Sequence, residues 1–294
     1  MRPGAIAPVL AIVGVGLIGG SVAAALRARG AVARVLGVGR QQASLSRALH
    51  LGLIDEAVTL EQAAASADII LLAMPVGATG AVLSELQPHL RLETLVTDTG
   101  STKMDVVAAA RLAMGDKIGQ FIPGHPIAGA ETVGPDSAEP ALFRGRTVVL
   151  TPLEENSGAD RARLTQLWEN CGARVMLMDA GQHDAILASV SHVPHLLSSV
   201  FMWQVASAGD SDLRMALAGS GFRDFTRIAA GSPEVWRDIF LTNRTAVLAE
   251  LQEVKAALLQ AEDALQAGDG KQLQDFLEHA ALARRFWGSR SGMS

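Results

Sequence analysis

The 294-residue sequence has no tyrosine, a single cysteine and few aromatic side chains, which make up 4% of its residues. Because Cys171 has no second cysteine to pair with, no disulfide can form within the chain, as is usual for proteins of reducing compartments. The net charge is only −5, so a nucleic acid or an anionic membrane is not expected as a partner. These absences predict a cytoplasmic protein.

Charged residues are also missing from residues 4–26, a run long enough to resemble a membrane span or a signal peptide. Glycines interrupt this run at positions 14, 16, 19 and 20, where they would suit a turn between a strand and a helix. We therefore interpret the run as a buried strand, a glycine turn and a buried helix, and we expect no membrane segment.

The first part of the chain alternates short β-rich runs with helical stretches. Continuous apolar strands that alternate with helices predict a parallel sheet with helices on both faces. Strands are expected at residues 9–13, 34–38, 57–59, 69–73, 95–97, 121–122, 147–150 and 174–178, and helices at 17–29, 43–51, 77–86 and 103–113.

After residue 178 the strand-like runs stop. Helices are expected at residues 180–208, 212–218, 233–267 and 271–287, and Ser232 followed by Pro233 suits a helix start. The predicted fold class is therefore α/β, with a Rossmann-type parallel sheet domain over residues 1–178 and an all-helical domain over 179–294. The polar stretch 154–160 is expected to be a loop.

A Gly-x-Gly-x-x-Gly motif lies between the first expected strand and the first expected helix. Gly14 would permit the tight turn, Gly16 would let the backbone approach a pyrophosphate, and Gly19 would let helix and strand pack closely. Such a motif alone is weak evidence, but the order strand, motif, helix favours a dinucleotide site at the helix N-terminus. Leu17 and Ile18, inside the motif, are expected to line it.

The end of the second strand bears on cofactor preference. Enzymes that use NAD usually place an acidic residue there, where it binds the ribose 2′-hydroxyl. This chain has Gly39 and Arg40, with no acid until Asp55. Arg40 could pair with a 2′-phosphate through its planar guanidinium, unless it is an ordinary surface arginine. We therefore predict NADP, with NAD as the alternative.

Two glycine-containing segments follow expected strands at the edge of the sheet where ligands bind. Residues 97–103 include Ser101, and residues 123–129 hold His125 between two prolines and two glycines. A structural histidine in a turn is the simpler interpretation of a single histidine. The position of His125 after a strand, together with the hydroxyl of Ser101 one strand earlier, favours a catalytic histidine.

The helical region adds two pairs of candidate residues. His192 and His195 are three apart, a spacing that places side chains on one helical face. No cysteine or carboxylate has the spacing to complete a metal site with them. Arg223 and Arg227 are four apart, so a bound dianion would explain the pair, although ion pairs with neighbouring acidic residues compete with that explanation.

Taken together, these motifs resemble the prephenate/arogenate (cyclohexadienyl) dehydrogenase family. The resemblance extends over nearly the whole chain and implies a Rossmann domain, a helical domain that forms a homodimer, and a site in the cleft between them. The motifs that carry it, in order, are Gly14–Gly20, Gly52–Asp55, Asp98–Lys103, Gly124–Gly129, Ser191–His195, Gly221–Ile228 and Trp236–Phe240 with Asn243.

The resemblance also implies a reaction. His125 would accept the proton of the substrate C4 hydroxyl while hydride leaves for the nicotinamide, and loss of CO₂ would then aromatise the ring. Ser101 would orient His125 and the nicotinamide. The substrate-binding residues implied are Arg227, for a carboxylate, His195 and Trp236, with Arg223, His192 and Glu131 as further candidates. Two positions depart from the family pattern, because Arg223 replaces a lysine of some members and Ala130 replaces a common hydroxyl residue.

Several alternatives stay open at this point. A dehydrogenase of the 6-phosphogluconate or 3-hydroxy-acid type would use a lysine of the helical domain, but no lysine occurs between Lys117 and Lys255. A non-catalytic NADP-binding protein could share the fold. The choice between prephenate and arogenate is not settled. No chorismate mutase or regulatory domain is expected beside the fold, so tyrosine, if it inhibits, is expected to compete at the active site.

Overall fold

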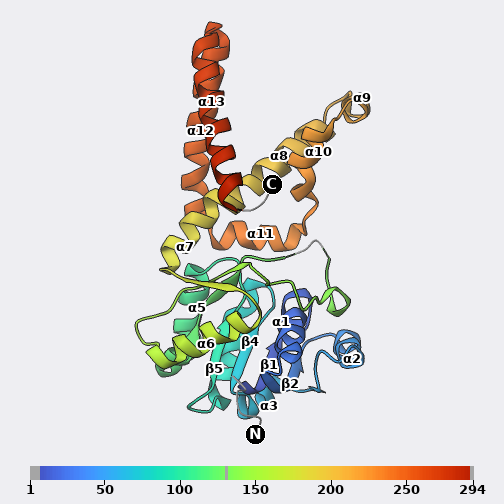
Figure 1. The fold of residues 1–294 in the computed structure, drawn as a ribbon, viewed down its shortest axis with the longest axis vertical. Helices are drawn as coiled ribbons and strands as arrows, with labels where there is room; N and C mark the ends of the chain where they lie inside the picture. The colour runs from blue at the N-terminus through green and yellow to red at the C-terminus, as the bar shows by residue number, and fades with distance from the viewer. Residues whose placement is uncertain (1–6, 130–131, 292–294) are drawn as a thin grey trace. The chain divides into compact units, whose positions relative to one another are not determined.

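The computed structural model describes residues 7–129 and 132–291 (Figure 1). The chain forms two compact units, Met1–Arg244 and Thr245–Ser294. The first unit contains the sheets and most of the helices, and the second consists of two long helices.

The first unit is built on a six-stranded sheet whose strands all run parallel, in the order β3-β2-β1-β4-β5-β6. The chain moves outward from β1 in one direction to β3 and then crosses back to β4, which creates a switch point beside β1, where ligands of such sheets bind. The predicted parallel sheet is confirmed. Its strands are β1 (Ala7–Val13), β2 (Val32–Val38), β3 (Glu56–Ala57), β4 (Ile69–Leu72), β5 (Leu95–Asp98) and β6 (Phe121–Ile122).

Helices cover both faces of this sheet, and alternate residues of the strands face opposite layers. Leu10 and Ile12 of β1 share a core with α1, α2 and α6, whereas Ala11 and Val13 share a core with α3, α4 and α5. Burial on both faces explains why the strands are continuously apolar. The helices are α1 (Leu17–Ala28), α2 (Gln42–His50), α3 (Leu60–Ser66), α4 (Thr79–Leu86), α5 (Met104–Met114) and α6 (Gly158–Asn170).

Three later strands form a second, smaller sheet, in the order β7-β8-β9 (Gly124–Pro126, Thr147–Leu150 and Arg174–Leu177). β7 pairs antiparallel with β8, and β8 pairs parallel with β9. The strands predicted at 147–150 and 174–178 are present but do not extend the main sheet, and residues 124–126, where no strand was predicted, form one. This segment is extended because it pairs with β8, more than twenty residues later in the chain.

Helix α6 corrects a second expectation. It begins at Gly158, inside the stretch 154–160 that was predicted to be a loop. Its N-cap, Ser157, accepts a hydrogen bond from the backbone N–H of Asp160, as expected for a serine at this position. The buried residues Leu164, Leu167 and Trp168 lie on one face of this helix, which places them in the core of the first unit.

The helical part of the first unit begins with α7 (Ala180–Leu187), a π-helical turn (Ala188–His192) and α8 (Val193–Ala206). A single regular helix was predicted here. Pro194 lacks a backbone N–H and its ring clashes with the preceding turn, which explains why the helix widens immediately before it. The remaining helices of this unit are α9 (Ser211–Ala216), α10 (Ser220–Thr226) and α11 (Pro233–Thr242).

Among the described helices, the stretch Ala180–Ala206 is long and apolar enough to cross a membrane by length and composition alone. A core helix of a soluble protein passes the same test. This stretch contains the buried polar residues His183, Asp184 and His192, which are hydrogen bonded to other parts of the first unit. The first part of this stretch therefore packs within the first unit, whereas side chains further along it, such as Val200 and Trp203, are exposed.

The second unit is a helical hairpin of α12 (Arg244–Ala267) and α13 (Gly270–Ser291) (Figure 1). The chain reverses at Gly268, whose φ of 63° lies in the left-handed region that glycine adopts readily. Residues 233–267, predicted as one helix, are divided between α11 and α12 at Asn243. Many large apolar side chains of the hairpin are exposed, among them Leu258, Leu259, Leu265, Phe276, Leu277, Leu282 and Phe286.

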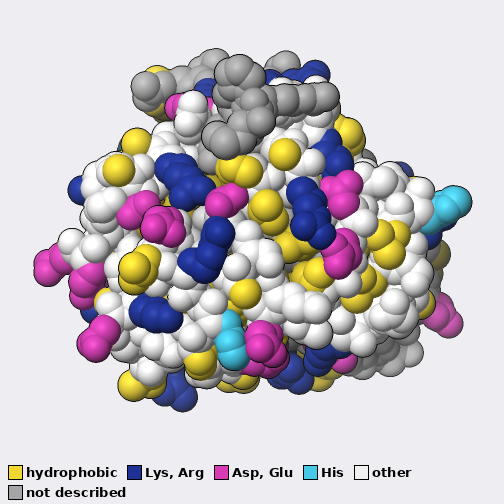
Figure 2. Space-filling model, turned by 90° about the horizontal axis from the view of Figure 1, so that it is seen from below, with side chains coloured by type: hydrophobic (Ala, Val, Ile, Leu, Met, Phe, Trp, Pro, Cys, Tyr) yellow, Lys and Arg dark blue, Asp and Glu magenta, His cyan; other side chains and the backbone are white. Residues whose placement is uncertain are grey.

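Charges of both signs are interspersed on the face of the molecule that Figure 2 shows. Several arginines of the first unit are paired with carboxylates, as Arg27 is with Asp55 and Arg47 with Asp136.

Candidate active site

The turn after β1 has a shape that only glycine can supply. Gly14 has a φ of 96°, and a Cβ atom there would lie 2.3 Å from the carbonyl oxygen of Ala73, which follows β4. The N–H of Gly14 donates to the carbonyl of Val38 at the end of β2. The turn is therefore held at the carboxyl ends of three neighbouring strands, at the switch point of the sheet.

The other two glycines of the motif have different surroundings. A Cβ atom at Gly19 would lie 2.4 Å from the carbonyl oxygen of Gly14, so helix and turn could not pack as closely with any other residue. A Cβ atom at Gly16 would meet no protein atom within 4 Å. Gly16 is the N-cap of α1, and the first turn of this helix carries no acidic side chain. The helix start can therefore accept an anion.

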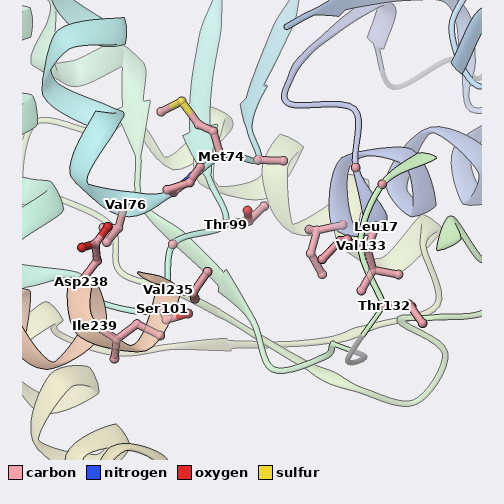
Figure 3. Close-up of a pocket in the computed structure, with 16 residues that line it drawn as sticks. Leu17, Met74, Val76, Thr99, Ser101, Thr132, Val133, Val235, Asp238 and Ile239 are labelled. Atoms are coloured by element: carbon pink, nitrogen blue, oxygen red, sulfur yellow. The ribbon is translucent and has the colours of Figure 1, made fainter. Parts of the chain in front are cut away.

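A cavity of about 450 Å³ lies in front of this turn (Figure 3). Leu17 and Val133 lie together at one side of it, and Ser101 lies near Val235 and Ile239 of α11. The structure thus brings four predicted residues, Gly16, Leu17, Ile18 and Ser101, into the wall of one cavity. The other lining residues are Ala73, Met74, Pro75, Val76, Thr99, Gly100, Thr132, Val133, Gly134, Val235, Asp238 and Ile239.

Gly39 and Arg40 lie just beyond the end of β2, and both are exposed. They do not line the 450 Å³ cavity. Asp55, the next acidic residue, pairs with Arg27 at 2.6 Å and accepts the backbone N–H of Val35 at 2.7 Å. These contacts hold its carboxylate against the middle of β2, away from the strand end where a ribose-binding acid would stand.

A buried ion pair joins the loop that carries Ser101 to the strand that carries His125. Lys103 Nζ lies 2.5 Å from Asp98 Oδ2 and 2.8 Å from the carbonyl oxygen of Gly124. Asp98 Oδ1 accepts the N–H of Gly124 in return, at 3.0 Å. Burial lowers the pKa of Lys103, and the charge of Asp98 opposes that effect. Residues 98–103 and β7 are therefore locked together.

His125 lies in the middle of β7 and keeps part of its surface exposed. Its Nδ1 atom is 2.9 Å from Nε2 of His183. Burial holds the pKa of His125 well below the usual 6.5, and Lys103, His183 and His192 lower it further, because positive charge on these neighbours disfavours a charged His125. The imidazole is therefore neutral at physiological pH. In the described part of the chain, His125 forms no hydrogen bond with Ser101, which was expected to orient it.

His183 contacts both His125 and the carboxylate of Asp184. Its Nδ1 atom is 2.8 Å from Oδ1 of Asp184, and both side chains are almost completely buried. Asp184 also accepts the backbone N–H groups of Lys103 and Met104, each at 2.8 Å, at the start of α5. Neither His183 nor Asp184 was singled out from the sequence.

The rings of His192 and His195, predicted to lie on one helical face, both contact the indole of Trp236. His195 stacks on Trp236, with ring centroids 3.5 Å apart and planes 14° apart, and the ring of His192 lies edge-on at 6.3 Å. The amide nitrogen of Asn243 lies 3.0 Å from Nδ1 of His192 and 2.8 Å from the carbonyl oxygen of Asp184. Burial lowers the pKa of each histidine to about 4.

The predicted arginines lie elsewhere in the first unit. Arg223 and Arg227 border a second cavity, of about 630 Å³, together with Met202, Met215 and Phe222. None of the residues lining this cavity lines the first one. Arg237 pairs at 2.7 Å with Asp238, which does line the first cavity. Glu131, a further predicted substrate contact, lies outside the described residues.

Comparison with known proteins identifies the family. Residues 22–177 match the nucleotide-binding domain of prephenate dehydrogenase, and residues 179–279 match its dimerization domain. The chain belongs to the prephenate dehydrogenase family. It is thus a dehydrogenase that uses a nicotinamide cofactor, with a Rossmann domain followed by helices, as the resemblance implied.

Individual relatives agree with this assignment. The cyclohexadienyl dehydrogenase of Zymomonas mobilis is 34% identical over 278 residues, which cover 94% of each chain. Among solved structures, prephenate dehydrogenase from Aquifex aeolicus, in complex with hydroxyphenyl propionate and NAD⁺, has a TM-score of 0.88 at 32% identity, over 94% of this chain and 97% of that one. The arogenate dehydrogenase of Synechocystis has a TM-score of 0.83 at 33% identity, over 95% and 99%.

Proposed function

We propose that this protein oxidatively decarboxylates prephenate, arogenate or both, with hydride transfer to NADP in preference to NAD. The observation that carries the proposal is the position of His125. This neutral imidazole is locked by the Asp98–Lys103 ion pair to the loop whose Ser101 lines the cavity in front of the dinucleotide turn. The names of the relatives support this choice of substrates.

The reaction needs one base, and its atoms balance without a net change in protons. His125 takes the hydrogen of the C4 hydroxyl as a hydride leaves C4, so C4 becomes a carbonyl carbon. The ring carboxylate then departs as CO₂, and its bonding electrons aromatise the ring to a phenolate. His125 returns the proton to this phenolate. The products are CO₂, the reduced cofactor and 4-hydroxyphenylpyruvate from prephenate or tyrosine from arogenate. A neutral histidine is suited to both transfers.

The residues around the first cavity fit a nicotinamide dinucleotide. The open space beside Gly16 and the N-terminus of α1, whose N-cap makes no side-chain hydrogen bond within the described residues, suit its pyrophosphate. When bound, the cofactor accepts the hydride. Thr99 and Ser101, which follow β5 and line the cavity, would orient its nicotinamide end, and apolar lining residues such as Leu17 and Val76 would exclude water from it.

The preference for NADP rests on Arg40 and on the position of Asp55. Arg40 is exposed two residues beyond Val38, whose carbonyl accepts the N–H of Gly14. A 2′-phosphate bound there would meet a guanidinium that can pair with it through two parallel hydrogen bonds. Asp55 is held by Arg27 and so provides no competing carboxylate.

On the substrate side, we propose that the stacked pair His195 and Trp236 forms a wall against the ring, with His192 beside it. Arg227 is proposed to bind a substrate carboxylate and Arg223 to support it. Because these arginines border the second cavity, their contribution needs a direct test. Arg227→Ala should raise KM for prephenate with little change in KM for the cofactor; an unchanged KM for prephenate would remove Arg227 from the site.

The proposal extends to assembly, regulation and location. The match to a dimerization domain and the exposed apolar side chains of α12 and α13 support a homodimer, which light scattering on the purified protein would test. Tyrosine resembles the aromatic product, so we expect it to raise KM for the substrate without lowering kcat. A cytoplasmic location is proposed from the single, buried Cys171.

The central experiment incubates the purified protein with prephenate or arogenate and with NADP or NAD. We expect reduced cofactor to form together with 4-hydroxyphenylpyruvate or tyrosine, identified by mass spectrometry. NADP should give a kcat/KM at least about tenfold higher than NAD, which corresponds to about 1.4 kcal/mol. If neither substrate is turned over with either cofactor, the proposed function is wrong.

A further inference from the structure

Behind His125 lie two side chains with no direct contact in the proposed reaction. His183 and Asp184, in the middle of α7, connect His125 to the start of α5 through hydrogen bonds, and they are 0% and 3% exposed. Two buried polar groups of this kind cost stability unless they are well paired. Their continuous connection to His125 therefore calls for an explanation in terms of the chemistry at that residue.

We propose that His183 and Asp184 are positioning residues, which fix the hydrogen of His125 on Nδ1 and so leave Nε2 as the base. This inference rests on the proposed function of His125. His183 and Asp184 would set the tautomer of His125 before the substrate binds.

The direction of the hydrogen bonds follows from Asp184. Its carboxylate accepts two backbone N–H groups at the start of α5, where the helix dipole also favours a negative charge. An ionised carboxylate can only accept, so Nδ1 of His183 must carry a hydrogen and donate it to Asp184.

The next link follows from the chemistry of a neutral imidazole, which carries a hydrogen on one nitrogen only. In a neutral His183 whose hydrogen is on Nδ1, the Nε2 atom can only accept. The facing Nδ1 of His125, 2.9 Å away, must then be the donor. Nε2 of His125 is left with a free electron pair, which is what a general base requires.

The same connection stabilises His125 after it has taken the proton. The imidazolium of His125 keeps its Nδ1–H hydrogen bond to His183, and His183 is in turn hydrogen bonded to the negatively charged Asp184. Lys103 acts in the opposite sense, since its positive charge disfavours protonation of His125. Its own pairing with Asp98 limits that effect. The hydrogen bonds from Asp184 through His183 thus set the tautomer of His125, while the ring stays neutral until it takes the proton.

His192 provides an internal comparison. The amide nitrogen of Asn243 donates to the carbonyl of Asp184 and also points at Nδ1 of His192. His192 therefore accepts at Nδ1 and carries its hydrogen on Nε2, the opposite arrangement from His125. At their Nε2 atoms, His125 would then be a hydrogen-bond acceptor and His192 a donor.

The first test replaces Asp184 with asparagine. An amide nitrogen at the Oδ1 position can donate to His183, at the cost of the hydrogen bond that Oδ1 accepts from the N–H of Lys103. All hydrogen bonds from Asp184 to His125 can then reverse, which places a hydrogen on Nε2 of His125. In a Ser-His-Asp triad the equivalent change leaves the geometry intact and lowers kcat by about 10⁴-fold. We expect Asp184→Asn to lower kcat with prephenate at least about 10²-fold, with KM and cofactor affinity within about threefold of wild type. Asp116→Asn, the same change at an exposed site, should leave kcat unaltered.

The pH dependence of kcat/KM in Asp184→Asn distinguishes a wrongly placed hydrogen on His125 from a site that has opened to water. The pKa of His125 is low chiefly because the ring is buried, so a site opened to water would move the acid limb of kcat/KM upward toward pH 6.5. Loss of the Asp184 charge disfavours the imidazolium, so in Asp184→Asn this limb should stay in place or move to lower pH. The other charged or titratable groups facing His125, namely Lys103, His183 and His192, are unchanged in that variant.

A second pair of variants guards against a folding defect in Asp184→Asn. In His183→Gln, the amide can still donate to Asp184 and accept from His125, so kcat should stay within about fivefold of wild type. In His183→Met, a side chain of similar size can do neither, and kcat should fall at least about tenfold below that of the glutamine variant. The two proteins should have similar thermal stability.

The outcomes distinguish this inference from the proposed function. If the wild-type protein turns over neither prephenate nor arogenate, the proposed function fails. If it is active and His125→Asn is not, but Asp184→Asn keeps a kcat within about threefold of wild type, only the positioning by His183 and Asp184 is refuted. Equal kcat values for His183→Gln and His183→Met would refute it as well.

Discussion

The first cavity and the cluster of histidines beside it are built in different ways. The cavity is formed largely by backbone and small side chains that directly follow strands β1, β4 and β5. The cluster is formed by side chains from segments far apart in the chain. His125 and His183 are separated by 58 residues, and Lys103 and Asp184 by 81. The part of the cavity wall that follows these strands therefore depends on short stretches of sequence, whereas the histidine cluster forms only in the folded unit.

This difference predicts that the two regions can be damaged separately. A change in the glycine turn should weaken cofactor binding and leave the base intact. A change in the histidine cluster should abolish turnover while the cofactor still binds. Four predictions test this separation.

The largest effect is expected from His125→Asn. Asparagine can occupy the position but cannot accept the hydroxyl proton, so kcat with prephenate should fall by about 10³-fold. The dissociation constant for NADP, measured by quenching of tryptophan fluorescence, should remain within about twofold of wild type. A variant with near-normal kcat would mean that another group is the base.

A smaller effect, on the other region, is expected from Gly14→Ala. The added Cβ would lie 2.3 Å from the carbonyl of Ala73, in a backbone conformation that alanine avoids. Distortion of the turn should raise KM for the cofactor at least about tenfold, while kcat at saturating cofactor changes less. Gly209→Ala is the matched control, because a Cβ atom there meets nothing within 4 Å. Equal KM values in the two variants would show that the turn does not position the cofactor.

Arg40→Ala should have a more modest and selective effect. Loss of the guanidinium should lower kcat/KM for NADP by about tenfold and leave the value for NAD nearly unchanged. Arg29→Ala, an exposed arginine after α1, serves as the control. If both cofactors are affected alike, Arg40 does not contact a 2′-phosphate.

The smallest effect is expected from pH. His125 is neutral above its pKa, which burial and neighbouring charges hold well below 6.5. Lowering the pH from about 7.5 to about 6 should therefore change kcat less than about twofold, whereas a histidine with an ordinary pKa would be about three-quarters protonated at the lower pH. A steep loss of kcat across this interval would show that the site does not keep His125 neutral.

Much of the fold followed from the sequence because it depends on neighbouring residues. The apolar runs of the main sheet and the glycine turn are visible over short stretches. Strand β7 was missed because its three residues are extended only through pairing with β8. Helix α6 could have been found, since Leu164, Leu167, Trp168 and Cys171 have helical spacing within an otherwise polar stretch.

The candidate site shows the same division. His125 and Ser101 were singled out from the sequence because each follows a strand at the edge where ligands bind. His183 and Asp184 gave no comparable signal, because a histidine and an aspartate near a helix start are usually exposed, and only the fold brings them behind His125. Asp98 and Lys103 lay within a recognised motif, but their burial as an ion pair could not be inferred from spacing.

The most direct test of the base is nitrogen NMR of the histidine side chains in the wild-type protein. The chain has seven histidines, so single His→Gln variants can assign the signals. At neutral pH, we expect His125 to be uncharged, with its hydrogen on Nδ1 and none on Nε2. A hydrogen on Nε2, or a charged ring at that pH, would contradict the account of His125 as the base.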